Sequence, residues 1–264
     1  MGRYLLSLIF VAAMLAPWNG TLAASVIALP AVADATLFEE SGDLASGADD
    51  GLFVGRNGNT AGFNQRRALL NFDFSGLPPG VHILTAVLEL TLTRSLALSD
   101  DVAVHRVNVM WGEGNSSAVR GGGRGGDADP GSATWTYASW HNRAWPAGGD
   151  FLTAASAIRT VTPAVGLRVT WEGLGLISDV QAWLNLDTGS FGWLLVATTI
   201  PAVSNAMRFA SREFALPSDR PLLRLAYEVL PTPVPVPPQS APFLLALLAI
   251  LRRRQRLLTP ADRP

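Results

Sequence analysis

Regular alternation of apolar and polar residues between His82 and Arg94 constrains the fold of this chain more than any other feature. One set of alternate positions is entirely apolar: Leu84, Ala86, Leu88, Leu90 and Leu92. The other set is Ile83, Thr85, Val87, Glu89, Thr91 and Thr93. Successive side chains of a strand point to opposite faces, so the first set predicts the buried face of an antiparallel strand.

Similar short runs recur along the chain and predict further strands. They lie at 35–39, 52–54, 67–74, 101–110, 134–137, 166–171, 191–199, 206–211 and 221–229. Turn-forming residues separate them, and the glycine-rich segment 112–132 predicts a long loop. Only the segment 175–186 has helical spacing. Many short strands with one short helix predict an all-β domain, a two-sheet β-sandwich, over residues 34–230.

An apolar stretch at the N-terminus predicts export. Arg3 precedes the apolar residues 4–16, which is the pattern of a signal peptide within residues 1–33. Cleavage after Ala24 and cleavage after Ala33 both remain open, and an uncleaved anchor is the alternative. In each case the chain is expected to leave the cytoplasm.

The C-terminal region has three parts: a proline-rich linker at 231–240, a hydrophobic segment with an arginine cluster at 241–256, and a tail at 257–264. Its characteristic residues are Val234, Pro235, Val236, Pro237, Arg252, Arg253 and Arg254. Arginines that follow an apolar segment are retained on the cytoplasmic side of a membrane. This order resembles the PEP-CTERM sorting signal, which implies processing by an exosortase-type membrane protease. The apolar run 241–251 would span only roughly 16 Å as a helix, so a tail with a weak interfacial helix is the alternative.

Composition excludes several kinds of chemistry. All 20 basic residues are arginine, and there is no cysteine. Lysine Schiff bases, disulfides, thiol nucleophiles and cysteine metal sites are therefore impossible. Residues 34–230 contain 14 arginines and 20 acidic residues, a net charge of −6. Nucleic acid is not an expected partner, because positive charge dominates phosphate binding.

An ordered series of short motifs resembles the DNRLRE domain over residues 34–229. The motifs lie at 52–55, 66–73, 77–80, 85–90, 111–114, 133–135, 180–184, 191–193, 209–213 and 220–227. The resemblance implies a jelly-roll sandwich akin to carbohydrate-binding modules, a kind of domain that is also found joined to polysaccharide-degrading enzymes.

One loop is rich in aromatic residues and is the candidate ligand-binding surface. Its members are Trp135, Tyr137, Trp140, His141, Arg143 and Trp145. Sugar rings stack on flat side chains, and Arg143 could add a charged hydrogen bond to a uronate. The alternative is that Trp135 and Trp145 fill the end of the sandwich.

Four charged residues predict a structural network: Arg67, Asp73, Arg212 and Glu213. We expect Arg67 or Arg212 to lie partly buried across strands and to bind Asp73 or Glu213 through both carboxylate oxygens. Neighbouring residues of a strand face opposite sides, so Arg212 and Glu213 are not expected to pair with each other. The alternative role is ligand contact.

No catalytic residue, cofactor or metal-ligand set is predicted. The three histidines lack ligand spacing. Acidic turns at 43–50 and 127–129 could offer oxygen atoms to a structural calcium ion, but solvated loop acids are the simpler interpretation. Tyr137 and His141 could act as acid and base of a polysaccharide lyase.

Together these patterns predict an exported, noncatalytic β-sandwich of the bacterial cell envelope, cell surface or exopolysaccharide matrix. Its expected partners are an exopolysaccharide or envelope glycan, bound weakly, the processing protease, and the membrane through the C-terminal segment before processing. A purely structural surface protein and a lyase-like enzyme are the alternatives.

Overall fold

The computed structural model describes residues 24–58, 64–96, 98–118, 123–199 and 204–229. The core of the expected signal peptide, the proline-rich linker, the C-terminal hydrophobic segment with its arginine cluster, and the tail lie outside the described residues. Among the described residues, no helix has both the length and the apolar character needed to cross a membrane.

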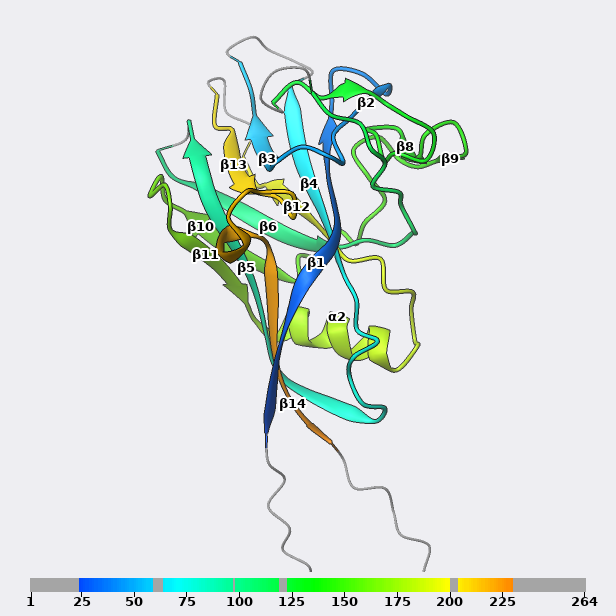
Figure 1. Cartoon of the computed structure of the whole chain (residues 1–264), viewed down its shortest axis with the longest axis vertical. Coiled ribbons are helices and arrows are strands. Elements are labelled where there is room, and N and C mark those ends of the chain that lie inside the picture. Colours follow the sequence, from blue (N-terminus) through cyan, green and yellow to red (C-terminus); the bar gives the residue numbers. More distant parts are fainter. Residues whose placement is uncertain (1–23, 59–63, 97, 119–122, 200–203, 230–264) are drawn as a thin grey trace, which may run out of the picture. The chain divides into compact units, whose positions relative to one another are not determined.

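Antiparallel strands are the main secondary structure of the described residues (Figure 1). They are β1 (Ser25–Phe38), β2 (Leu44–Ala45), β3 (Gly51–Arg56), β4 (Gln65–Phe72), β5 (Val81–Ser95), β6 (Asp100–Arg106), β7 (Gly126–Asp127), β8 (Tyr137–Ser139), β9 (Arg143–Ala144), β10 (Ala157–Val161), β11 (Arg168–Glu172), β12 (Trp193–Ala197), β13 (Met207–Ala210) and β14 (Leu222–Val229). The helical segments are α2 (Leu174–Leu184) and a short 3-10 helix, Pro217–Asp219. The predictions of an all-β domain and of one α-helix near residues 175–186 are confirmed.

The main sheet closes on itself. Its strands follow the order β1-β14-β5-β13-β3-β4, and β4 pairs again with β1. β12, β6 and β10 continue from β4, and β11 pairs with β5. The result is a barrel-like closed sheet. It agrees with the predicted all-β class, but it does not divide clearly into the two separate sheets that were predicted.

β1 closes this sheet by changing partners along its length. Its first half, from Ser25 to Pro30, pairs with β14, and its second half, from Ala31 to Phe38, pairs with β4. A register shift between Ala31 and Ala33 marks the change. Such a bulge bends a strand and increases its twist, which lets one strand serve both sides of a closed sheet.

The alternation in β5 predicts its buried face correctly except at one end. Four members of the predicted set are buried: Ala86, Leu88, Leu90 and Leu92. Leu84 was also expected to be buried, but it is 37% exposed. The pairing with β14 skips Leu84, because Thr85 and Ile83 lie opposite consecutive β14 residues. This bulge directs Ile83 into the core, where it is 1% exposed, and turns Leu84 outward.

α2 is positioned by hydrogen bonds to β5 as well as by packing. Gln181 accepts a hydrogen bond from the backbone N–H of Ile83 at 2.9 Å and donates one to the carbonyl oxygen of Val81 at 3.1 Å. Leu176 and Val180 on the buried face of α2 join the main hydrophobic cluster. The helix therefore covers part of the barrel interior.

The two ends of the described chain lie together. Ser25 pairs with Tyr227 near the end of β14, and Val229 at that end pairs with Val81.

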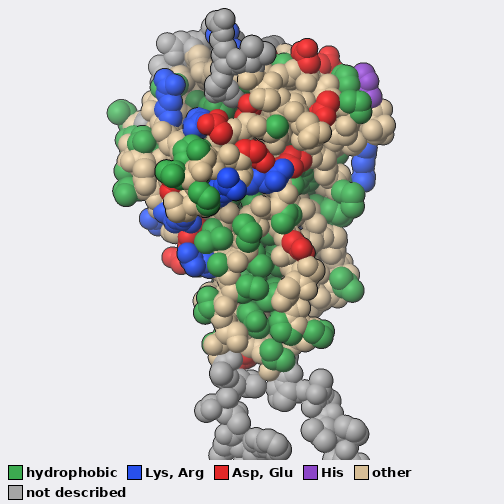
Figure 2. All heavy atoms as spheres, in the orientation of Figure 1, with side chains coloured by type: hydrophobic (Ala, Val, Ile, Leu, Met, Phe, Trp, Pro, Cys, Tyr) green, Lys and Arg blue, Asp and Glu red, His purple; other side chains and the backbone are tan. Residues whose placement is uncertain are grey.

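In Figure 2, charged side chains gather mainly on the upper part of the visible face, and the part nearer the two ends carries mostly hydrophobic and uncharged side chains.

Candidate functional site

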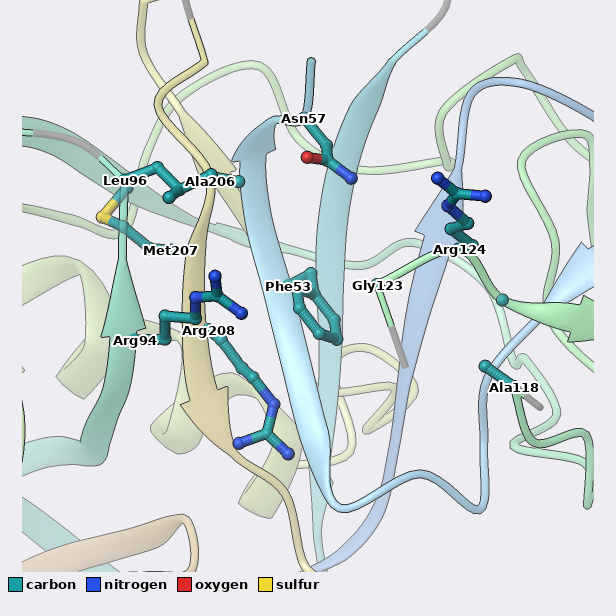
Figure 3. A pocket seen from close by; sticks show the side chains of 11 residues that line it. Phe53, Asn57, Arg94, Leu96, Ala118, Gly123, Arg124, Ala206, Met207 and Arg208 are labelled. Atoms are coloured by element: carbon teal, nitrogen blue, oxygen red, sulfur yellow. The ribbon is translucent and has the colours of Figure 1, made fainter. Parts of the chain in front are cut away.

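An open groove of about 660 Å³ lies at the end of β5 that is remote from Ser25 and Val229 (Figure 3). β3, β13, the end of β5 and the segment Gly123–Gly125, which precedes β7, contribute to it. Its lining residues are Phe53, Asn57, Arg94, Leu96, Ala118, Gly123, Arg124, Gly125, Ala206, Met207 and Arg208. Three of them are arginines and one is aromatic, so the groove combines positive charge with an apolar surface.

Arg94 and Arg208 lie directly opposite each other on the paired strands β5 and β13. Like charges in directly opposed positions destabilise a sheet. Arg208 is neutralised by an ion pair with Asp50, and it also donates a hydrogen bond to the Thr93 hydroxyl at 3.0 Å. Arg94 has no such partner among the described residues. The two side chains extend in different directions (Figure 3), and only the charge of Arg208 is paired within the described part of the protein.

Arg124 approaches the groove from the other side (Figure 3). Its side chain is exposed, and it has no hydrogen-bond or ion-pair partner among the described residues. The half-buried ring of Phe53 lies between Arg124 and the pair formed by Arg94 and Arg208. The Arg208 guanidinium carbon is 5.9 Å from the centre of the Phe53 ring.

Gly123 lies beside the ring of Phe53. A side-chain carbon placed at Gly123 would lie 3.4 Å from the edge of that ring. A larger residue at this position would cover the ring and narrow the groove. The arrangement can hold a ligand that presents an apolar face to Phe53 and oxyanions to the surrounding guanidinium groups, because arginine binds carboxylates through a planar fork of donors.

Sequence reasoning missed this groove. Its arginines come from segments far apart in the chain, and none lies in a recognisable motif. Only strand register could have placed Arg94 opposite Arg208, and that register depends on a bulge at β13, between Arg208 and Phe209.

The predicted aromatic loop divides into a buried and a surface part. Trp135 and Trp145 are each 8% exposed and belong to the second hydrophobic cluster. The Trp145 indole also donates a hydrogen bond to the carbonyl oxygen of Thr134 at 3.1 Å. Their rings therefore serve the core, as the packing alternative expected, and present little surface to a ligand.

Tyr137, Trp140, His141 and Arg143 remain at or near the surface. The rings of Trp140 and His141 stack at 3.9 Å, and Tyr137 contacts His141 edge-on at 5.7 Å. The Trp140 indole donates a hydrogen bond to Asp43 at 3.1 Å. One face of Trp140 is thus covered by His141, which reduces the area available for stacking on a sugar ring.

The predicted pairing of Arg67 with Asp73 is wrong. Arg67 donates a hydrogen bond to the carbonyl oxygen of Gly148 at 2.7 Å and lies over the Trp135 ring at 4.9 Å. Burial lowers the pKa of its guanidinium. Asp73 instead accepts hydrogen bonds from the backbone N–H and the hydroxyl of Ser75, which lower its pKa and hold a local turn.

Arg212 does form a structural network, but with a different main partner. It binds both carboxylate oxygens of Glu113, at 2.6 and 2.7 Å. It also lies 2.9 Å from Glu213, so the expectation that Arg212 and Glu213 do not pair is wrong. β13 ends at Ala210, and both residues belong to the turn after it. The rule that neighbouring residues face opposite sides therefore does not apply to them.

Asp34, Glu113 and Glu213 form a carboxylate triad around Arg212, with one oxygen of each acid within 4.8 Å of the others. Asp34 is 1% exposed, and burial raises its pKa well above the usual value. Burial also raises the pKa of Glu213. Carboxylate oxygens so placed can ligate a cation, but the Arg212 guanidinium already pairs with Glu113 and Glu213, and its backbone N–H donates a hydrogen bond to Asp34. The triad therefore joins the loop at Glu113 to β1 and to the turn after β13.

The acidic loops have their own hydrogen bonds. Asp49 accepts hydrogen bonds from the hydroxyls of Ser46 at 2.6 Å and Ser117 at 2.9 Å. Asp129 accepts hydrogen bonds from Ser116 and Ser132; burial opposes their effect, but the pKa of Asp129 falls to about 2. Both aspartates thus stabilise the loop conformation.

Comparison with known proteins gives no match: no family model fits the chain, and no curated protein is similar to it.

Proposed function

We propose that this chain is an exported, noncatalytic protein of the envelope or exopolysaccharide matrix that binds an acidic glycan weakly in the arginine-lined groove. In this proposal, the closed sheet is a member of the jelly-roll sandwiches that the DNRLRE resemblance implies, and the C-terminal region is a PEP-CTERM-type sorting signal.

The observation that carries the proposal is the excess of unpaired positive charge around Phe53. Arg94 and Arg124 have no partner among the described residues, although the domain as a whole is acidic. An oxyanion bound by Arg94 and Arg124 would pair with their charges and gain charge-assisted hydrogen bonds. An aromatic ring beside these groups favours a ligand with an apolar ring face, such as a uronate residue.

The chemistry of the groove favours retention of a ligand over its cleavage. Its described lining residues contain no carboxylate and no histidine, which are the usual groups for general acid and base catalysis. The overall negative charge of the domain repels a polyanion at long range. Binding is therefore expected to be weak and to weaken further with added salt.

The groove and the C-terminal end of the domain lie at opposite ends of β5, which suits a protein anchored to the cell surface through its C-terminal region. β5 carries Val81 at one end and Ser95 at the other, so the groove and Val229 lie near opposite ends of a strand that is at most roughly 45 Å long. A chain that leaves the domain after Val229 and anchors it would hold the groove away from the anchor.

The test compares binding of the purified protein to polygalacturonate, an acidic glycan, and to dextran, a neutral one. The double variant Arg94→Gln/Arg124→Gln should weaken binding to polygalacturonate about 100-fold, because each charged contact contributes about 1.4 kcal/mol, a factor of ten in affinity. Arg159→Gln is the matched control, because Arg159 is an exposed arginine on β10, outside the groove.

Each outcome selects one function. Binding to polygalacturonate that the double variant loses and the control keeps supports the proposal. Release of shortened chains would support the lyase-like enzyme instead. Absence of both binding and release would leave the purely structural role.

The surface formed by Tyr137, Trp140, His141 and Arg143 is a second candidate site, because it joins aromatic rings to an exposed arginine. If this surface binds the glycan, Trp140→Ala should weaken retention while the Arg94→Gln/Arg124→Gln variant binds normally.

A further inference from the structure

We infer that the leader is removed between Ala24 and Ser25, so that all of β1 belongs to the mature protein. This inference rests on the proposed export and decides between the two cleavage sites that the sequence leaves open. The enzyme that cleaves this bond would be a signal peptidase. Hydrolysis adds water across the Ala24–Ser25 amide, leaving a carboxylate on Ala24 and an ammonium group on Ser25.

The segment between the two sites is an integral part of the sheet. Residues from Ser25 to Pro30 pair in register with β14. Leu29 and Ala31 are each only 8% exposed and belong to the main hydrophobic cluster. The backbone N–H of Ala31 also donates a hydrogen bond to the carbonyl oxygen of Pro221 at 3.2 Å. A leader that is discarded would have no need of these contacts.

Cleavage after Ala33 would open the sheet. It would remove the first half of β1 and leave the hydrogen-bonding groups of β14, from Leu222 to Tyr227, without a partner on that side. An exposed strand edge is a site of edge-to-edge association. In the intact protein this side ends in the first half of β1, where Pro30 lacks an N–H group and is suited to an outer strand.

The new N-terminus is accessible to water after cleavage at Ala24. Ser25 is exposed, so water can solvate the ammonium group that this cleavage creates.

The first experiment identifies the N-terminus of the exported protein. The full chain is expressed in a Gram-negative host, and the folded product is analysed by intact mass and N-terminal sequencing. A product that begins at Ser25 supports the inference. A product that begins at Asp34 overturns it but leaves the proposed export intact. A product in the cytosol that retains Met1 overturns both.

Matched substitutions in the full chain provide the second experiment. Signal peptidases require a small residue before the cleaved bond. Ala24→Gln should therefore cause the precursor to accumulate, whereas Ala33→Gln should be processed normally; the reverse pattern overturns the inference.

A third measurement tests the strand itself. Leu29→Ala should lower the urea midpoint of the exported protein, and Val26→Ala, at a position 73% exposed, should not. An unchanged midpoint in the Leu29 variant would show that this segment is absent from the mature domain.

Discussion

The ion pair between Arg212 and Glu113 should contribute measurably to stability. Two short contacts join these side chains, at 2.6 and 2.7 Å. A hydrogen bond to a charged group contributes about 1.5–3 kcal/mol when it is well shielded, and an exposed ion pair contributes about 0.2–1 kcal/mol. The Arg212 side chain is 38% exposed and that of Glu113 is 17% exposed, so solvent screens part of the interaction. We expect a coupling energy of about 1.5 kcal/mol, between these limits.

A double-mutant cycle measures this coupling. Arg212→Ala alone should cost about 3 kcal/mol, because it leaves the carboxylate triad without its cation. Glu113→Ala should cost about 2 kcal/mol, because Arg212 keeps its contact with Glu213. The free energies of unfolding come from urea titrations of both single variants and the double variant.

Arg159→Ala is the control for removing an exposed arginine side chain, and it should change the free energy of unfolding by less than about 0.5 kcal/mol. Additive single effects, with a coupling near zero, would refute the structural role assigned to Arg212. A folded Arg212→Ala variant that had lost only glycan binding would instead show that Arg212 contacts the ligand.

Four further predictions follow, two on pH and one each on backbone geometry and calcium. The pKa of Asp34 is raised in the folded state, so this residue contributes stability at pH values below its ordinary pKa of 3.8. This contribution is lost as the pH rises through the folded-state pKa. Asp34→Asn should therefore raise the free energy of unfolding at pH 7 and flatten the pH dependence of that free energy above pH 4. The pKa of Asp129 is lowered to about 2, so Asp129→Asn should lower the free energy of unfolding at pH 7, and this loss should disappear as the pH falls toward 2. Equal pH profiles of the Asp34 and Asp129 variants would contradict both pKa shifts. Gly192→Ala should lower the thermal midpoint far more than Gly80→Ala. The backbone angle φ is positive at both positions, 75° at Gly192 and 71° at Gly80. A carbon added at Gly192 would lie 1.9 Å from a backbone oxygen, whereas a carbon added at Gly80 meets nothing within 4 Å. Calcium at about 1 mM is in the range that extracellular modules bind. It should leave the thermal midpoint unchanged, because Arg212 already pairs with the carboxylate triad. A clear increase in the thermal midpoint would reveal a metal site.

Strand positions were predictable where alternation is local and long. The run in β5 identifies both the strand and most of its buried face, because side-chain direction follows directly from strand geometry. The error at Leu84 arises from a bulge, which depends on the register with β14 and not on the local pattern. β10 was missed because a short outer strand with exposed residues in its middle has no apolar alternation.

Function-related residues were harder to predict, because their roles depend on contacts between distant segments. Trp135 and Trp145 lie in an aromatic loop that suggests a binding surface, yet both fill a hydrophobic cluster. Arg212 was predicted to join a charged network, and it does, but its main partner, Glu113, is 99 residues away. The groove unites Phe53, Arg94 and Arg208, which only the paired strands bring together.

The antiparallel contact of β14 with both β1 and β5 has a mechanical consequence. A bound polymer would pull on the groove at one end of β5, and an anchor beyond Val229 would pull at the opposite end. The load would then run lengthwise along β14, in shear, so that many interstrand hydrogen bonds share the tension instead of breaking one after another. Removing the first half of β1 would take away one of the two rows that resist sliding, and the domain should then yield at a lower pulling force.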